Sequence, residues 1–299
     1  MLQKFNSKNT NILVSIDNQL IPREQAKISV FDSAVQGGDA VWEGLRVYKE
    51  GIFSLDKHLE RLENSAKALA FEGVPEREVM RQAIFSTLEA NNMKKDAHIR
   101  LTLTRGEKVT SGMDPRLNQK GCCLIVLAEW KPPVYDNAKG IRVITSAIRR
   151  NNPQMLDSKI HHNNLLNNIL AKIQANVAGA DAAIMLDDNG FVSELNDTNI
   201  FMVNKGVLYT PSPDSCLPGI TRSIVINEAK TSGIDIVERN ISLTECYTAD
   251  EVFATGTMGE LTPIIEIDGR KIKNEGEILA LLQEKFRKSI SEGCEKLPF

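Results

Sequence analysis

The 299-residue chain has no apolar run of the roughly 20 residues that a membrane-spanning helix requires, so we expect no membrane partner. Its first residues also lack the apolar core and small-residue cleavage site of a secretory signal. Lysine and arginine total 36 against 39 aspartate and glutamate, a net charge of −3, and no basic block stands out. These absences disfavour a nucleic-acid partner. Any anionic substrate must therefore be bound by a few positively charged or N–H groups at its site, because the net charge of the protein would not attract it.

Cysteine is scarce. There are five, an odd number, and none stands in a C-x-x-C pair. Cys122 and Cys123 lie in an apolar run in which alternate side chains face opposite ways. We interpret them as buried free thiols of a cytoplasmic protein. His161 and His162 are adjacent and have no cysteine or aspartate at ligand spacing, so we expect no metal site.

The composition is that of a folded domain. Hydrophobic residues make up 42% and charged residues 25%, which excludes wholesale disorder. The length allows one large or two ordinary domains. Short β-rich runs alternate with helical patterns, which favours an α/β or α+β architecture.

The first part of the chain predicts a compact α/β region. The expected strands are 11–17, 27–32, 40–48, 51–55, 98–106 and 121–130, and the expected helices are 57–71 and 76–91. The segment KPPVYDNAKG follows, with two prolines and several turn formers, and predicts a linker. We therefore expect domains at 1–129 and 140–299, joined by residues 130–139.

The second part begins with an expected strand at 141–150 and a polar turn at 151–163. A helix is predicted over 163–177, because Leu166, Leu170, Ile173 and Val177 recur on one face. Two hairpins follow. The first turns at Asn189-Gly190, and the second turns at 204–206.

Two charged residues of this second part, Lys159 and Glu194, each allow two interpretations. Lys159 lies in a turn between a strand and a helix, where a lysine is ordinarily a solvated surface residue. If burial lowered its pKa, it could instead form a Schiff base with an aldehyde. Glu194 follows a hairpin strand and could be an exposed carboxylate. Its alternative is a buried partner for a cationic heterocycle, since opposite charges favour each other at low dielectric.

Two small-residue turns suit an anion. Leu217–Arg222, LPGITR, reads as a glycine turn that opens a helix at about Thr221–Ser232, with Ile224, Val225 and Ala229 on its apolar face. Free N–H groups at a helix start bind phosphate, although a capped helix without a ligand explains the pattern as well. Thr255–Glu260, TGTMGE, follows a strand and is either a second cradle or an ordinary turn. In order, a lysine, a carboxylate and two cradles describe a pyridoxal phosphate (PLP) site.

The same residues resemble the class IV, or fold-type IV, PLP-dependent aminotransferases. This group includes branched-chain and D-amino-acid aminotransferases, aminodeoxychorismate lyases and (R)-amine transaminases. The family signature is matched by Glu194, Asn199-Ile200-Phe201, Thr210 and Leu217–Arg222. Asn196 departs from it, because the family usually has a small residue there. The resemblance extends through 38–48, 58–69, 98–100 and 251–263.

The resemblance implies a D-amino-acid-aminotransferase-like α+β fold with a small N-terminal domain and a larger pseudo-barrel domain. It also implies a homodimer in which each site lies between the domains and is closed by the partner subunit. Lys159 would be the Schiff-base lysine and proton shuttle, and Glu194 the partner of the pyridine nitrogen. Phosphate ligands would be Arg61, Ile220, Thr221, Gly256 and Thr257. Substrate contacts would come from Trp42, His98, Arg100, Met258 and Gly259.

The substrate branch remains open, because this chain departs from each subgroup. Branched-chain enzymes usually have tyrosines where this chain has Gly37, His98 and Asn164, and phenylalanine where it has Trp42. D-amino-acid enzymes usually carry an Arg-x-His pair that Arg105-Gly106-Glu107 does not supply.

VWEGLRVY and GTMGELTP look most like the branched-chain branch. We therefore expect transfer of an amino group from L-leucine, L-isoleucine or L-valine to a 2-oxo acid such as 2-oxoglutarate. Arg100 would hold the distal carboxylate of that acceptor, although a strand arginine in a salt bridge explains it as well. The alternatives are a D-amino-acid transaminase, a lyase of the aminodeoxychorismate type, and a PLP-binding protein without turnover.

Overall fold

The computed structural model describes residues 3–299, and the chain divides into two compact units. The small unit holds residues 3–132 together with Ile160–Asn164 and Gly293–Phe299, and the large unit holds Pro133–Lys159 and Leu165–Glu292. The first division falls within the segment predicted as a linker. The stretches 160–164 and 293–299, which the sequence placed in the second domain, cluster with the small unit.

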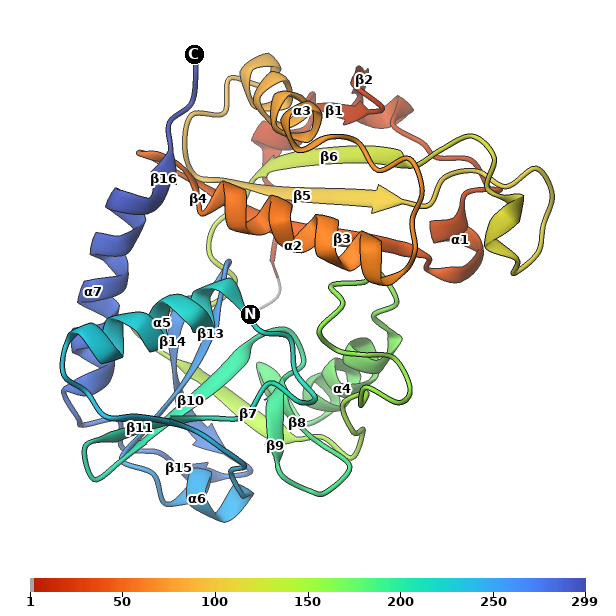
Figure 1. Cartoon of the computed structure of the whole chain (residues 1–299). Helices are drawn as coiled ribbons and strands as arrows, with labels where there is room; N and C mark the ends of the chain where they lie inside the picture. Colours follow the sequence, from red (N-terminus) through yellow and green to blue (C-terminus); the bar gives the residue numbers. More distant parts are fainter. Residues whose placement is uncertain (1–2) are drawn as a thin grey trace. The chain divides into compact units, whose positions relative to one another are not determined.

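The small unit is built on one antiparallel sheet of seven strands, in the order β16-β4-β3-β5-β6-β1-β2 (Figure 1). The strands are β1 (Leu13–Ile16), β2 (Gln19–Pro22), β3 (Ala40–Tyr48), β4 (Gly51–Phe53), β5 (Ala97–Thr104), β6 (Cys123–Trp130) and β16 (Cys294–Glu295). β3 pairs with the whole of β5 from Ala40 to Val47, with Gly44 opposite Arg100 and Arg46 opposite His98. Because side chains alternate along a strand, these four residues share one face of the sheet.

Two helices, α2 (Leu55–Ala68) and α3 (Arg77–Ala90), cover the opposite face (Figure 1). The helix predicted over 57–71 is present as α2, and its apolar residues Leu59, Leu62 and Ala66 are fully buried. They pack in one core with residues of β3 and β5. A short helix, α1 (Ser33–Gly37), precedes β3, and the Asp32 side chain caps it by accepting from the Ala34 N–H.

The large unit is built on a nine-stranded mixed sheet that curls into a half-barrel. Eight strands follow the order β12-β11-β10-β13-β14-β7-β8-β9, and β15 pairs with β14. The strands are β7 (Ile141–Thr145), β8 (Ala182–Leu186), β9 (Val192–Leu195), β10 (Asn199–Asn204), β11 (Val207–Thr210), β12 (Ile236–Glu238), β13 (Glu251–Gly256), β14 (Glu260–Ile267) and β15 (Arg270–Lys271).

Four helices belong mainly to this unit: α4 (Leu166–Val177), α5 (Ile220–Thr231), α6 (Leu243–Tyr247) and α7 (Ile278–Gly293). Helix α5 packs on β13 and buries the apolar face predicted for it. Within the described residues, no helix is long and apolar enough to cross a membrane.

Two strand predictions are wrong. Residues 27–32 form a loop in which only Asp32 makes a β-bridge, and Val30 and Phe31 are exposed because no strand pairs with them. The strand predicted over 141–150 ends at Thr145, where Asp268 accepts hydrogen bonds from the Thr145 amide and hydroxyl.

Both predicted hairpins are present as antiparallel pairs, β8–β9 and β10–β11. In the second, Lys205 and Gly206 both have positive φ, 50° and 79°. Two such residues match the twist of the strands they join, and this conformation favours glycine.

Candidate active site

Lys159 lies in a turn of the large unit and its side chain is exposed. The carboxylate of Asp157 accepts a hydrogen bond of 3.0 Å from the Lys159 backbone N–H, which fixes the turn. The neighbouring Ser158 is buried, and its hydroxyl donates to the Asn151 carbonyl at 2.7 Å. The lysine is thus presented to solvent from an anchored backbone, as a nucleophile that must reach a ligand requires.

The residues after Lys159 extend the sheet of the small unit. The Trp42 N–H donates to the His161 carbonyl at 3.0 Å, and the Asn163 N–H donates to the Ala40 carbonyl at 2.7 Å. Val41 and His162 form the antiparallel bridge between them. β4 pairs only with the last residues of β3, so the first half of β3 is open to this segment.

Glu194 is buried at the end of β9 and forms an ion pair with Arg150. The Arg150 Nε donates to one carboxylate oxygen at 2.7 Å, and the Asn199 amide donates to the other at 3.1 Å. Burial raises the pKa of Glu194, and the charge and hydrogen bond of Arg150 act in the opposite direction. A second cationic partner would therefore favour the ionised carboxylate further.

The predicted glycine turn opens α5. Gly219 is the N-cap, and no side chain bonds to the helix start. No hydrogen bond of the Ile220 or Thr221 amide was found in the described structure, so both remain as donors for an anion. A Cβ on Gly219 would lie 2.1 Å from the Asn199 Oδ1, so this position requires glycine.

The second small-residue turn begins where β13 ends. Thr255 at the end of β13 pairs with Asn199 at the start of β10. A Cβ on Gly256 would lie 2.8 Å from the methyl group of Thr198. The two predicted cradles therefore flank Asn199. Thr257 is half-buried beside them.

The rest of the TGTMGE turn is held by its own backbone. The Met258 carbonyl accepts from the Val134 N–H at 3.1 Å, and the Gly259 N–H donates to the Gly256 carbonyl at 3.3 Å. Of the two amides predicted to meet a substrate carboxylate, that of Gly259 is thus engaged within the turn.

Arg61, on α2 in the small unit, is bound side-on to Glu43 of β3. Its Nε and Nη2 each donate to a Glu43 oxygen at 2.7 Å. Glu43 is fully buried and also contacts His58 and His161. Burial alone would raise the pKa of Glu43, but the charges and hydrogen bonds of His161 and Arg61 hold it well below its ordinary value.

This lowered pKa predicts a pH-dependent contribution to stability. A carboxyl whose folded-state pKa is depressed stabilises the fold above its unfolded pKa of about 4.3, and the contribution is lost as the pH falls through the folded value. We expect Glu43→Gln to lower the free energy of unfolding by about 3–5 kcal/mol at neutral pH, since it leaves Arg61 unpaired in a largely buried site. Below about pH 4.3 the difference from wild type should shrink.

Urea titrations between pH 3 and pH 7 would measure this difference. The control is Glu63→Gln, which breaks the more exposed pair with Arg77 on the same helix and should cost about 1 kcal/mol or less. A Glu43→Gln difference that grows on acidification would contradict the assignment.

The sheet face away from the helices carries a cationic cluster from β3 and β5: Trp42, Arg46, His98 and Arg100. The Arg100 guanidinium stacks on Trp42 at 3.8 Å, and its Nη2 donates to Asn163 at 2.5 Å. Burial lowers the pKa of Arg100 to about 10. Burial and the positive charges of Lys131, Arg100 and Arg46 lower the pKa of His98 to about 3, so that this ring is neutral at physiological pH.

Arg46 was not predicted from the sequence. It is buried, and within the described residues its Nε and Nη1 have no hydrogen-bond partner. An unpartnered buried guanidinium is costly, and a bound carboxylate would satisfy it. Arg150 and Glu43 were missed as well. An arginine in a strand or turn carries no periodic signal, and only tertiary pairing reveals its partner.

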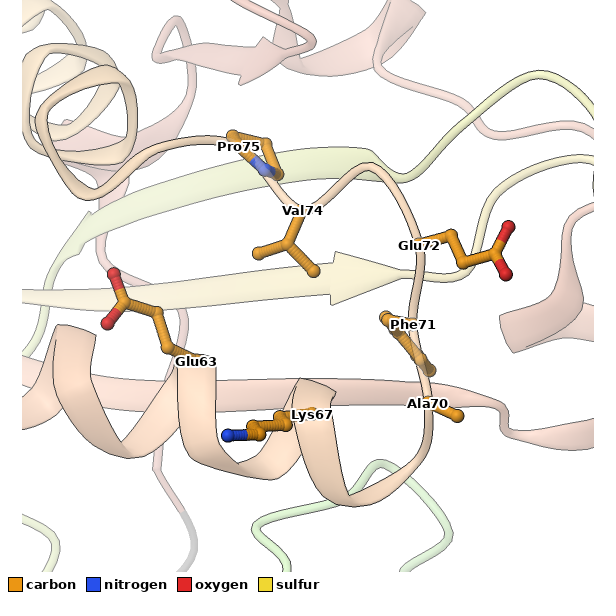
Figure 2. Close-up of a pocket in the computed structure, with 7 residues that line it drawn as sticks. All are labelled: Glu63, Lys67, Ala70, Phe71, Glu72, Val74 and Pro75. Atoms are coloured by element: carbon orange, nitrogen blue, oxygen red, sulfur yellow. The ribbon is translucent and has the colours of Figure 1, made fainter.

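The small unit also has a pocket of about 530 Å³ beside α2, lined by Glu63, Lys67, Ala70, Phe71, Glu72, Val74 and Pro75 (Figure 2). None of the predicted site residues lines it. It is a surface hollow separate from the groups described above. In the described part of the chain, no cluster of three or more metal-ligating side chains was found.

Taken together, the two units define a class of protein with a seven-stranded antiparallel domain and a half-barrel that carries a buried carboxylate beside a glycine-opened helix. The family model for amino-transferase class IV matches residues 40–267. The chain belongs to the class IV aminotransferase family, and within it is similar to branched-chain aminotransferases.

Three curated relatives show the range of this similarity. Branched-chain-amino-acid aminotransferase-like protein 2 of Arabidopsis thaliana is 59% identical over 283 residues, covering 94% of this chain and 51% of its own length. Branched-chain-amino-acid aminotransferase of Pseudomonas aeruginosa is 34% identical over 289 residues, covering 93% of both chains. D-alanine aminotransferase of Listeria monocytogenes is 32% identical over 289 residues, covering 96% and 99%. The chain spans about half the length of the Arabidopsis relatives.

Among solved structures, the branched-chain aminotransferase from the thermophilic archaeon Thermoproteus uzoniensis with norvaline is similar, with a TM-score of 0.86 and 33% identity. The match covers 94% of this chain and 96% of that one. The predicted fold is thereby confirmed.

Proposed function

We propose that this chain is a PLP-dependent transaminase that moves the amino group of an L-branched-chain amino acid to a 2-oxo acid such as 2-oxoglutarate. The substrate side of the proposal is supported by its similarity to branched-chain aminotransferases over 93% of the chain. D-alanine aminotransferase is similar over a comparable length, so the experiment below distinguishes the two.

One observation carries the cofactor assignment. The Asn199 amide donates both to Glu194, at 3.1 Å, and to the Leu217 carbonyl of the glycine turn, at 2.8 Å. A single side chain thus fixes the carboxylate that would hold a pyridine nitrogen and the turn whose free amides would hold a phosphate. A cofactor with a cationic ring and a phosphate fits both groups.

PLP, when bound, supplies an aldehyde for the amino group and an electron sink for the Cα electrons. The chain's own residues do the rest. Lys159 would hold the aldehyde carbon, and its amine would carry the proton between Cα and that carbon. Glu194 would pair with the protonated ring nitrogen, and Arg150 favours the ionised form of Glu194 against the effect of burial. Ile220, Thr221, Gly256 and Thr257 would bind the phosphate.

The small unit would supply the groups for substrate carboxylates. Arg46 has two unpartnered nitrogens, and Arg100 presents a planar fork stacked on Trp42. Because His98 is neutral and lies opposite Arg46, it can accept or donate a hydrogen bond without adding charge. The carboxylates of an amino acid or an oxo acid would supply the negative charge that pairs with Arg46 and Arg100 on this sheet face.

Arg100→Met tests the acceptor. We expect the KM for 2-oxoglutarate to rise about 10–100-fold, since a hydrogen bond to a charged group is worth about 1.5–3 kcal/mol. The KM for an oxo acid with a single carboxylate should change much less. If steady-state assays gave the same increase in KM for both acceptors, Arg100 would not bind the distal carboxylate.

We further propose that the chain forms a homodimer through α4. The stripe predicted on this helix, Leu166, Leu170, Ile173 and Val177, faces outward together with Ile169. These five side chains are 47% to 86% exposed, while Ala171 and Ala175 are buried against β8. Lys172 is the only charged residue of the helix. A two-fold contact brings identical surfaces together, so an apolar, nearly uncharged stripe suits a second copy of this chain.

Ile173→Glu should convert this dimer to a monomer, because the contact would place two carboxylates in an apolar seam. Light scattering after gel filtration measures the mass. Lys230→Glu, an exposed change on α5, is the control and should leave the mass unaltered. A wild-type monomer, or a dimeric Ile173→Glu variant, would refute the proposed contact.

The function is tested by the visible spectrum of the protein reconstituted with PLP, recorded with L-leucine and separately with D-alanine. Bleaching of the yellow colour by L-leucine alone supports the proposal. Bleaching by D-alanine alone identifies a D-amino-acid transaminase, and no response to either favours the lyase or another amine. A protein that cannot take up PLP would overturn the Lys159 assignment.

A further inference from the structure

The buried Glu43 carboxylate joins three parts of the small unit. Arg61 and His58 reach it from α2, and His161 reaches it from the segment that follows Lys159. One oxygen lies 2.7 Å from the Arg61 Nε and 3.1 Å from the His161 Nδ1. The other lies 2.7 Å from the Arg61 Nη2 and 2.6 Å from the His58 Nδ1. Both oxygens are therefore saturated by groups that come from distant parts of the sequence.

The pairing with Glu43 fixes how Arg61 is presented. The guanidinium is planar, and its Nε–Nη2 edge is used by the carboxylate. In the described structure no partner of Nη1 was found, so this nitrogen remains as a donor directed away from Glu43. Under the proposed function, that donor meets the phosphate of the cofactor.

His161 acts on this pair from the side. The His161 Nδ1 lies 3.1 Å from a Glu43 oxygen, which can only accept, and 3.4 Å from the Arg61 Nη2, which can only donate. Nδ1 can serve only one of them, and we assign the proton of the neutral imidazole to Nδ1, donating to Glu43 over the shorter distance. Burial lowers the pKa of His161, which keeps the ring neutral. The ring also packs against Trp42 with centroids 4.3 Å apart. The His161 ring therefore lies between the Trp42 ring and the Glu43–Arg61 pair.

The backbone of His161 is fixed as firmly as its ring. Its N–H donates to the Ser65 hydroxyl of α2 at 3.1 Å, and its carbonyl accepts from the Trp42 N–H at 3.0 Å. Ile160, next to Lys159, packs against the core of the small unit. The chain leaving Lys159 thus enters an anchored segment within two residues.

We propose that His161 is a positioning residue that ties the chain following Lys159 to the Glu43–Arg61 pair, so that one buried carboxylate sets both the phosphate arginine and the path of the cofactor lysine. The inference rests on the proposed function, because it presupposes a phosphate-bearing cofactor at Arg61. It concerns a histidine for which the sequence analysis found no role.

The test compares His161→Leu, which removes the donor, with His161→Asn, whose amide nitrogen stands near the place of Nδ1. PLP and pyridoxal, which lacks the phosphate, are titrated into the apoproteins by visible absorbance. We expect His161→Leu to weaken PLP binding about tenfold or more and pyridoxal binding little, and His161→Asn to retain most of the PLP affinity. Glu63→Gln, which breaks the Arg77 pair on α2, should bind both as the wild type does.

The outcomes separate this inference from the proposed function. If the wild type binds no PLP, the proposed function fails. If the wild type binds PLP and His161→Leu binds it equally well, or loses pyridoxal and PLP in equal measure, the positioning role is wrong. Should His161→Leu not fold, ¹⁵N NMR of the wild-type holoprotein decides. A neutral ring protonated on Nδ1 supports the inference, and a proton on Nε2 alone overturns it.

Discussion

Replacing Lys159 with alanine is expected to lower the transamination rate by at least about 10⁴-fold while leaving the fold intact. Proton transfer by a positioned side chain alone contributes about 10²–10⁴-fold, and Lys159 would also serve as the nucleophile for the aldehyde. The side chain is exposed, so its removal leaves no cavity, and the hydrogen bond of its backbone N–H to Asp157 is retained. Single-turnover and steady-state assays would measure the loss.

The control for this experiment is Lys230→Ala, an exposed lysine of α5 in the same unit. It should keep wild-type turnover and thermal stability. Reduction of the wild-type holoprotein with borohydride, followed by peptide mass spectrometry, should locate the cofactor on Lys159. A Lys159→Ala enzyme within tenfold of wild type, or a label on another lysine, would contradict the role.

Glu194→Gln is expected to cut turnover by about 10²–10³-fold, the usual cost of removing one preorganised electrostatic group. A neutral amide lacks the negative charge that favours a protonated ring nitrogen, and Arg150 would then stand beside it with its charge unbalanced. The α5 amides proposed to bind the phosphate are untouched, so PLP should remain bound. The rate of colour bleaching by the amino donor reports the chemical step directly.

The matched control is Glu251→Gln, which alters another buried carboxylate of the large unit. Glu251 accepts from the amides of Ile278 and Leu279 at 3.2 and 2.8 Å, and so caps α7. We expect this variant to lose thermal stability but to retain turnover per folded molecule. If both variants lost activity only in proportion to stability, Glu194 would be a structural carboxylate and not a partner of the ring.

The sequence alone indicated the chemistry of the large unit. Lysine, glutamate and the two small-residue turns come in a fixed order, and the two turns mark a helix start and a strand end that local rules can recognise. The helix opened by Gly219 and the hairpin turn at Lys205-Gly206 are both present, because backbone conformation there depends on neighbouring residues. The linker predicted over 130–139 rests on local composition in the same way.

The tertiary structure decided which groups meet. Glu43 and His161 are 118 residues apart, and Arg150 and Glu194 are 44 apart, so no local pattern links them. The loop at 27–32 has the alternation of a strand but no strand to pair with, and the stripe of α4 faces outward because the small residues Ala171 and Ala175 pack on β8. Local sequence sets backbone conformation within a few residues, whereas the partner of a buried charge depends on sheet register and on chain segments that only folding brings together.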